Sequence, residues 1–114
     1  MANTINRNPG GNTVELSAID ADWTWSDTFS ESQYENGIRI NFIQFNTAAA
    51  ADVCIIKDGS ATGPKIFKAT GHSVELVREK TIYYGGARMK PFLDVGDGAY
   101  NAAATVIINI INDI

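Results

Sequence analysis

Two tryptophans carry the clearest binding chemistry in this chain. Trp23 and Trp25 are two positions apart, so on an extended segment both indoles point to the same face. An exposed pair of this kind can stack on a sugar ring or anchor a protein interface. A buried pair would instead fill the core or cover its open end. The sequence alone leaves both alternatives open.

Two short acidic motifs have the carboxylates that calcium prefers. These are Asp94-x-x-Asp97, which precedes a glycine, and Asp20-x-Asp22. Calcium takes about six to eight oxygen ligands, often from loops, but neither motif has the EF-hand spacing. Because Asp beside Gly is also ordinary turn chemistry, we expect these acids to form turns and no metal site.

The remaining reactive residues do not form a recognisable catalytic set. His72, the only histidine, follows a glycine in an expected tight turn, and Cys54 is enclosed by apolar neighbours. One histidine and one cysteine fall short of the roughly four ligands of a structural zinc site. The chain also lacks the Gly-x-Ser-x-Gly sequence that exposes a nucleophilic serine. We therefore expect no catalytic residue, no cofactor and no enzymatic activity.

The elements that must position these residues are all short strands. The apolar runs are rich in Ile and Val, lack a 3.6-residue stripe, and end at Gly, Pro, Asn or Asp. The clearest are residues 38–42, 53–56, 73–77 and 106–111. The pattern predicts an all-β fold, a single-domain antiparallel β-sandwich that is jelly-roll-like, with about eight to ten short strands. Residues 1–12 form a polar arm or edge segment, and residues 13–114 form the sandwich domain.

Several local features of the strands can also be predicted. In the strand 38–45 the apolar parity shifts after Phe42, which indicates a β-bulge or burial on both faces. The turn-rich segment 58–64 should join strands 53–57 and 65–69 in a hairpin. Tyr83 and Tyr84 should point to opposite faces. The other expected strands are Thr13–Ala18, a short one at 22–26, and 81–84 and 88–93 on either side of Gly85-Gly86. Residues 27–37 are expected to form a long loop, with or without one helical turn.

The N-terminal segment is a candidate for contact with a neighbouring molecule. Thr4–Arg7 can form a short edge strand or a free arm before the turn at 8–12. Such a segment can add a strand to an exposed edge of a neighbour, so we hypothesise that residues 1–12 make this contact. The candidate interface residues are Asn3, Thr4, Ile5, Asn6, Arg7, Trp23 and Trp25.

Composition excludes several classes of partner. The 114 residues carry a net charge of −4, which disfavours binding to a nucleic acid backbone. No apolar run approaches the ~20 residues of a membrane span, and the N-terminus lacks the features of a signal peptide. A single cysteine fits synthesis in a reducing cytoplasm. Seven basic residues of the second half are expected on solvated strand faces: Lys57, Lys65, Lys68, Arg78, Lys80, Arg88 and Lys90.

Strand and turn patterns across residues 36–111 resemble those of a known group of proteins. The segments concerned are Ile38–Asn46, Val53–Gly59, Gly63–Phe67, Arg88–Asp94 and Ala102–Ile110. Together they resemble small β-sandwich virion proteins of tailed bacteriophages, of the kind that decorate or cement a capsid.

This resemblance implies a virion protein that stabilises the head shell through non-catalytic contacts. Its partners would be the major capsid protein or another virion protein, and it would assemble as a homo-oligomer, with a trimer favoured. The alternative is a carbohydrate-binding module that uses Trp23 and Trp25 as a stacking platform, since fold alone does not choose between the two roles.

Overall fold

The computed structural model describes residues 3–7, 11–47, 51–70 and 79–111. The expected strand at 73–77, the turn with His72 and the segment 48–50 lie outside the described residues. The described residues form β-strands and two short 3₁₀-helices, and no α-helix. In chain order the elements are β1 (Thr4–Asn6), β2 (Thr13–Ser17), β3 (Trp23–Thr24), η1 (Trp25–Asp27), η2 (Ser32–Tyr34), β4 (Ile38–Asn46), β5 (Val53–Asp58), β6 (Lys65–Thr70), β7 (Glu79–Met89), β8 (Pro91–Leu93) and β9 (Thr105–Ile111).

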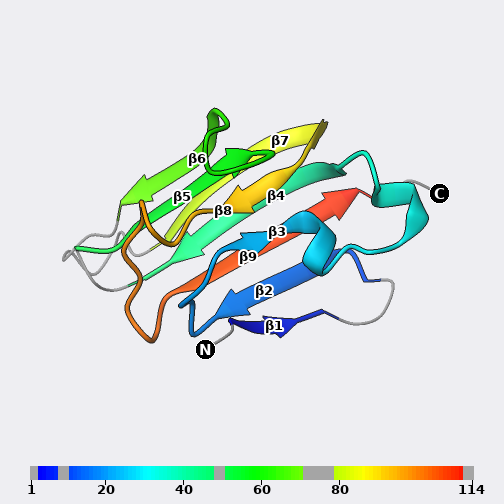
Figure 1. Ribbon diagram of the computed structural model, residues 1–114. Helices are drawn as coiled ribbons and strands as arrows, with labels where there is room; N and C mark the ends of the chain where they lie inside the picture. The colour runs from blue at the N-terminus through cyan, green and yellow to red at the C-terminus, as the bar shows by residue number, and fades with distance from the viewer. Residues whose placement is uncertain (1–2, 8–10, 48–50, 71–78, 112–114) are drawn as a thin grey trace.

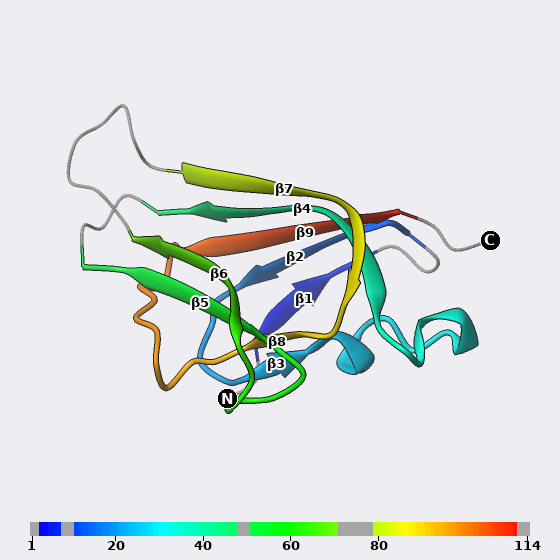
Figure 2. The same cartoon turned by 90° about the horizontal axis from the view of Figure 1, so that it is seen from above.

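The strands form two facing antiparallel sheets, as Figures 1 and 2 show. One sheet has the order β1-β2-β9-β4-β7 and the other has the order β3-β8-β5-β6. The strand pairs are nested in the sequence. The outermost pair is β2 with β9, and inside it lie β3–β8, then β4–β7 and then β5–β6. This is the double Greek-key arrangement of a jelly roll, with β1 added at one edge. The predicted all-β sandwich is therefore confirmed.

Alternating apolar residues of both sheets fill the space between them. Along β9 the residues alternate between partly exposed and buried, so one side of the strand faces the core. The largest fully buried side chains come from both sheets and from the β3–β4 connection: Leu16, Trp23, Phe29, Tyr34, Ile38, Ile40, Ile43, Phe45, Ile56, Phe67, Leu93 and Ile108.

A bulge is present in β4, which is one of the two alternatives that the parity shift predicted, but it lies before Phe42 and not after it. The pairing of β4 with both β7 and β9 changes register between Ile40 and Phe42. Ile40 and Ile43 are both fully buried, and the bulge allows both to face the core although two residues lie between them, a spacing that puts side chains on opposite faces of a regular strand. The predicted hairpin of β5 and β6 is also confirmed.

The segment around Gly85-Gly86 differs from the expectation. The two glycines do not separate two strands: β7 continues through them to Met89, and both have positive φ, at 63° and 85°. Glycine adopts such angles without steric cost, so the strand can bend here without ending. The break comes after Met89, and the chain crosses to the other sheet to begin β8 at Pro91 (Figure 2).

Candidate interaction surfaces

The edge strand β1 carries the exposed members of the predicted N-terminal interface. Thr4, Ile5 and Asn6 pair with Ser17, Leu16 and Glu15 of β2, and β1 is the last strand of its sheet. All three β1 residues are exposed, and 43% of the surface of Ile5 is accessible. Among the described strands, none pairs with the backbone edge of β1 that faces away from β2, so this edge can accept another strand.

Arg7 fixes the end of β1 to the body of the domain. Its guanidinium forms a bidentate ion pair with Glu31, at 2.7 and 3.0 Å, and donates to the Thr28 carbonyl at 2.9 Å. It also lies over the Phe29 ring, 4.4 Å from the centroid. The Arg7 hydrogen bond lowers the pKa of the Glu31 carboxyl below its ordinary value. Arg7 is thus an internal clamp, and its side chain does not present a surface to a partner.

Asn3 anchors the other end of β1. Its side-chain oxygen accepts hydrogen bonds from the backbone N–H groups of Asp20 and Ala21, at 2.8 and 3.0 Å. Its side-chain nitrogen donates to the Ala21 carbonyl at 2.8 Å. Residues 3–7 therefore lie along their own domain as an edge strand and not as a detached arm.

The two tryptophans do not form the platform that their spacing suggested. Trp23 is fully buried, and its indole N–H donates to the Thr28 hydroxyl at 2.9 Å. The extended segment ends at Thr24, and Trp25 begins the 3₁₀-helix η1, so the two side chains do not share a strand face. Trp25 is half-buried and donates to the Tyr34 carbonyl at 2.9 Å. A stacking platform built on Trp23 and Trp25 is therefore wrong.

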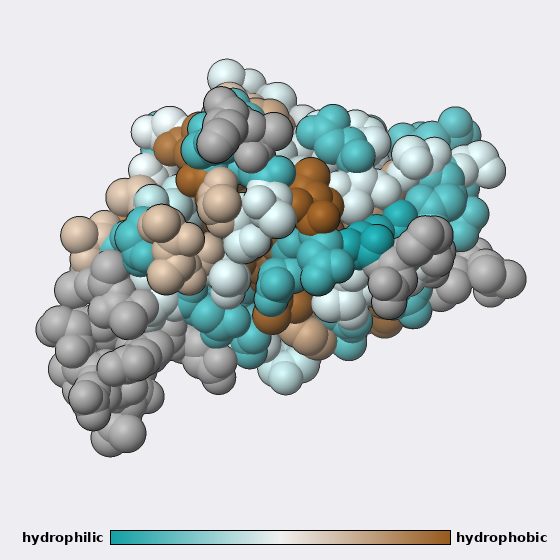
Figure 3. All heavy atoms as spheres, turned by 90° about the horizontal axis from the view of Figure 1, so that it is seen from below, coloured by the Kyte–Doolittle hydropathy of each residue, from teal (hydrophilic) through white to brown (hydrophobic). Residues whose placement is uncertain are grey.

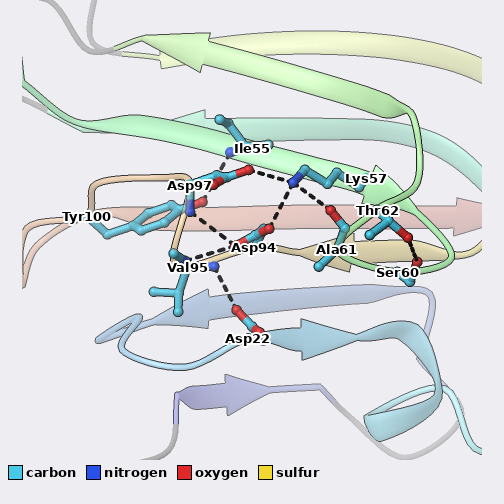
Figure 4. A network of polar contacts seen from close by, with 11 residues as sticks. Asp22, Ile55, Lys57, Ser60, Ala61, Thr62, Asp94, Val95, Asp97 and Tyr100 are labelled. Atoms are coloured by element: carbon cyan, nitrogen blue, oxygen red, sulfur yellow. Dashed lines mark hydrogen bonds and ion pairs between the residues drawn. The ribbon is translucent and has the colours of Figure 1, made fainter.

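The acidic motif at 94–97 surrounds an ammonium group (Figure 4). Lys57 Nζ donates to Asp94 at 2.9 Å, to Asp97 at 2.6 Å and to the Ala61 carbonyl at 2.8 Å. Lys57 and Asp94 are both buried, which corrects the expectation that Lys57 lies on a solvated face. Hydrogen bonds to Asp97 and Asp94 raise the pKa of Lys57, and the bond from Lys57 lowers the pKa of Asp94.

Two further carboxylate oxygens of these motifs bind backbone donors. Asp94 Oδ1 accepts from the N–H groups of Gly96 and Asp97, at 2.9 and 3.1 Å. Asp22 Oδ1 accepts from the N–H of Val95 at 2.8 Å, so this acid fixes the same loop against β3. These acids thus connect β5, β8 and β3 at one end of the sheet. Within the described residues, no group of three or more His, Cys, Asp or Glu side chains is arranged to hold a metal.

Cys54 is fully buried in β5, as its apolar neighbours predicted. Burial raises the pKa of its thiol from 9.0 to about 12. Tyr100, whose hydroxyl accepts from the Ile55 N–H at 3.1 Å, also has a raised pKa because of burial. A thiolate nucleophile is therefore disfavoured at neutral pH.

The buried thiol predicts that stability falls at alkaline pH. Because the pKa of Cys54 is higher in the folded than in the unfolded chain, the unfolded chain releases this proton first as the pH rises above about 9. The free energy of unfolding should then decrease by up to ~1.4 kcal/mol per pH unit from this group. Urea titrations between pH 8 and 11 should show a shallower decrease for Cys54→Ala than for the unmodified chain. Equal slopes would contradict the assignment.

A surface that the sequence did not single out is the outer face of the five-stranded sheet. Pairing between the strands places outward residues of its middle part in two adjacent rows, with Arg39, Arg88 and Ile111 beyond one of them and Asn46 and Thr105 beyond the other. The aromatic row runs from β7 to β2 and consists of Tyr83, Phe42, Asn109 and Thr13. The amide row runs from β7 to β1 and consists of Thr81, Gln44, Ile107, Glu15 and Asn6.

The polar side chains of this face are bonded to one another. Gln44 Nε2 donates to the Thr81 hydroxyl at 3.0 Å, and Asn109 Nδ2 donates to the Thr13 hydroxyl at 2.7 Å. Asn41, at the bulge, donates to Asn109 Oδ1 at 2.9 Å. These bonds fix the orientation of the amides within the face.

Tyr83 is the most exposed large side chain of the face. Its accessible fraction is 73%, and the centre of its ring lies 5.6 Å from that of Phe42.

Tyr84 points to the other side of β7. Its hydroxyl donates to the Ile66 carbonyl of β6 at 2.5 Å, so the prediction that the two tyrosines point to opposite faces is confirmed. The alternation within 38–46 and 105–111 shows that Gln44 and Asn109 face outward, but only the pairing of distant strands brings them beside Tyr83.

None of the helices in the described part of the chain is long and apolar enough to cross a membrane. Comparison with known proteins finds no matching family model, no matching curated protein and no matching solved structure.

Proposed function

We propose that this chain is a structural protein of a tailed-bacteriophage virion, a decoration or cement protein that stabilises the head shell through non-catalytic contacts. The strand and turn patterns across residues 36–111 resemble such proteins, and the jelly roll is a common fold of viral capsid domains. Because the same fold also serves lectins and enzymes, the proposal depends on a surface and not on the fold.

The observation that carries the proposal is the free edge of β1, held rigid at both ends. Asn3 and Arg7 fix the strand to its own domain, while Ile5 remains exposed between them. An edge strand offers backbone hydrogen bonds to an added strand, and a preformed edge loses little conformational entropy on binding. Hydrophobic residues form only small separate patches on this side of the molecule in Figure 3, which suits a contact made mainly by backbone pairing.

The proposed partner is the major capsid protein or another virion protein. The chain would be made in the host cytoplasm and would function in the virion, without a cofactor. A homo-oligomer, with a trimer favoured, would repeat a modest edge contact around a symmetry axis and so increase avidity. Native mass spectrometry of the purified protein measures the number of subunits directly, and a monomer would contradict the oligomeric part of the proposal.

The edge contact can be tested with a charge placed on β1. Lysine on an edge strand blocks pairing with a further strand, because the ammonium would have to be desolvated. Ile5→Lys should weaken binding to heads that lack the decoration protein by about tenfold or more, measured by co-sedimentation over a concentration series.

Thr70→Lys is the matched control, since Thr70 is exposed at the end of β6, an edge strand of the other sheet. It should bind heads as the unmodified protein does. Circular dichroism checks that both variants keep the β-sheet spectrum. Equal binding by Ile5→Lys and Thr70→Lys would remove β1 from the contact, and absence of binding by the unmodified protein would overturn the proposed function.

A further inference from the structure

We infer that the outer face of the five-stranded sheet is a binding site for a neutral polysaccharide chain, with Tyr83 as its stacking residue. This inference rests on the aromatic row and the amide row, and it does not require the proposed contact of β1 with a capsid, although Asn6 of the amide row belongs to β1.

Tyr83 has the exposure that sugar stacking requires. With 73% of its surface accessible, its ring can lie against the apolar C–H face of a pyranose. Phe42 supports the ring from the neighbouring strand at 5.6 Å. Because Phe42 is directly opposite Tyr83 in the register of β4 and β7, the pair is held by the sheet and does not depend on a loop.

The amide row supplies hydrogen bonds of both kinds. Sugar hydroxyls donate and accept, and so do side-chain amides and hydroxyls. The bonds given above use one N–H of Gln44, to Thr81, and one lone pair of its oxygen, from Asn46 at 3.2 Å. A primary amide has two N–H donors and two lone pairs, so Gln44 keeps one of each for a ligand. Its orientation is already fixed, which lowers the entropy cost of binding.

A shallow hollow lies at the other end of the two rows. It has a volume of about 250 Å³ and is lined by Asn6, Thr13, Glu15 and Ile107. This is below the ~300–1,000 Å³ of enclosed ligand pockets, so it suits one ring of a longer chain and not an isolated ligand. Glu15 can accept two sugar hydroxyls, and the Ile107 side chain provides an apolar floor.

The length and charge of the face indicate the class of ligand. Three strand spacings of ~4.8 Å separate Tyr83 on β7 from Glu15 on β2, which gives a path of roughly 14 Å across the sheet. Such a path spans several sugar rings. Glu15 is the only charged residue of the two rows, and its carboxylate disfavours an anionic chain along them; the neighbouring row of Arg39, Arg88 and Ile111 lies beyond this path. Polar residues separate Phe42 and Tyr83 from Ile107. These two rows therefore contain no continuous apolar patch of the kind that marks a protein interface.

Affinity electrophoresis of the full chain tests the inference. The native gels would contain one soluble polysaccharide each: dextran, hydroxyethyl cellulose, xylan, galactomannan or the anionic chondroitin sulfate. We expect at least one neutral polymer to retard the unmodified protein. Tyr83→Ala should weaken this binding by about tenfold, because it removes the stacking ring, whereas Tyr83→Phe should stay within about threefold.

The matched control is Thr70→Ala, which alters an exposed residue of the other sheet and should be retarded as the unmodified protein is. Retardation by no neutral polymer, retardation by chondroitin sulfate alone, or equal retardation of Tyr83→Ala would each overturn the inference. If Tyr83→Ala instead lost binding to phage heads while no polysaccharide was bound, the face would belong to a protein contact. Failure of the β1 test with retention of polysaccharide binding would leave this inference intact.

Discussion

Replacement of Lys57 by methionine should lower the melting temperature by about 10 °C or more. The ammonium of Lys57 neutralises the buried Asp94 and connects it to Asp97 and the Ala61 carbonyl. Methionine fills a similar volume but leaves the Asp94 carboxylate buried without a cation, and an unpaired buried charge is strongly destabilising. Thermal unfolding followed by circular dichroism measures the change.

Two further variants isolate the cause of this loss. Lys65→Met alters an exposed lysine that pairs with Lys57 across the hairpin, and it should change the melting temperature by no more than a few degrees. In Lys57→Met/Asp94→Asn the uncompensated charge is gone, so the double variant should be more stable than Lys57→Met alone. A double variant no more stable than Lys57→Met would show that the unpaired charge of Asp94 is not the cause of the loss.

The same contact governs behaviour in acid. The pKa of Asp94 is lower in the folded chain than in the unfolded chain, so its stabilising contribution is present above its ordinary pKa of 3.8. The contribution disappears as the pH falls through the lowered value. In Lys57→Met the largest cause of the lowered pKa is removed and only the N–H groups of Gly96 and Asp97 remain, so acid titrations should show a smaller decrease of stability in this range.

Trp23→Ala should destabilise the domain by about 3–5 kcal/mol, the typical cost of removing a large buried aromatic side chain. Trp23 has no accessible surface and is part of the core between the sheets, and its loss also leaves the Thr28 hydroxyl without its donor. Since domains of this size are stable by only about 5–15 kcal/mol, a large fraction of the variant should be unfolded in mild denaturant. Urea unfolding provides the measurement.

Trp25→Ala serves as the comparison. Trp25 is half-buried and packs against the core from η1, so its replacement should cost about 1–2 kcal/mol. Similar losses for the two variants would show that Trp25 contributes as much to the core as Trp23 does. A loss below about 1 kcal/mol for Trp23→Ala would contradict its place in the core.

The sequence predicted the strands well because their evidence is local. Alternation marked the faces of β2 and β4, short runs rich in Ile and Val marked β5 and β9, and the parity shift near Phe42 indicated the bulge. Turn residues between 58 and 64 predicted the hairpin. Each of these features depends on neighbours in the chain, which the sequence displays directly.

Features that depend on distant partners were missed. The Trp23–Trp25 platform failed because the chain turns into η1 after Thr24; the capping-box pattern Thr24-x-x-Asp27 is the one local signal of that change. Lys57 looked like a solvated lysine because its partners, Asp94 and Asp97, are some forty residues away and meet it only when β5 pairs with β8. The rows on the outer face likewise require β4, β7 and β9 to be side by side.

The central position of β9 has a consequence for how the chain folds during synthesis. This strand lies between β2 and β4, and it pairs Val14 with Ile108. The middle of the five-stranded sheet therefore cannot close until residues 105–111 have left the ribosome. Until then, β2 and β4 each have an unpaired inner edge, so nascent chains depend on rapid completion or on chaperones to avoid aggregation.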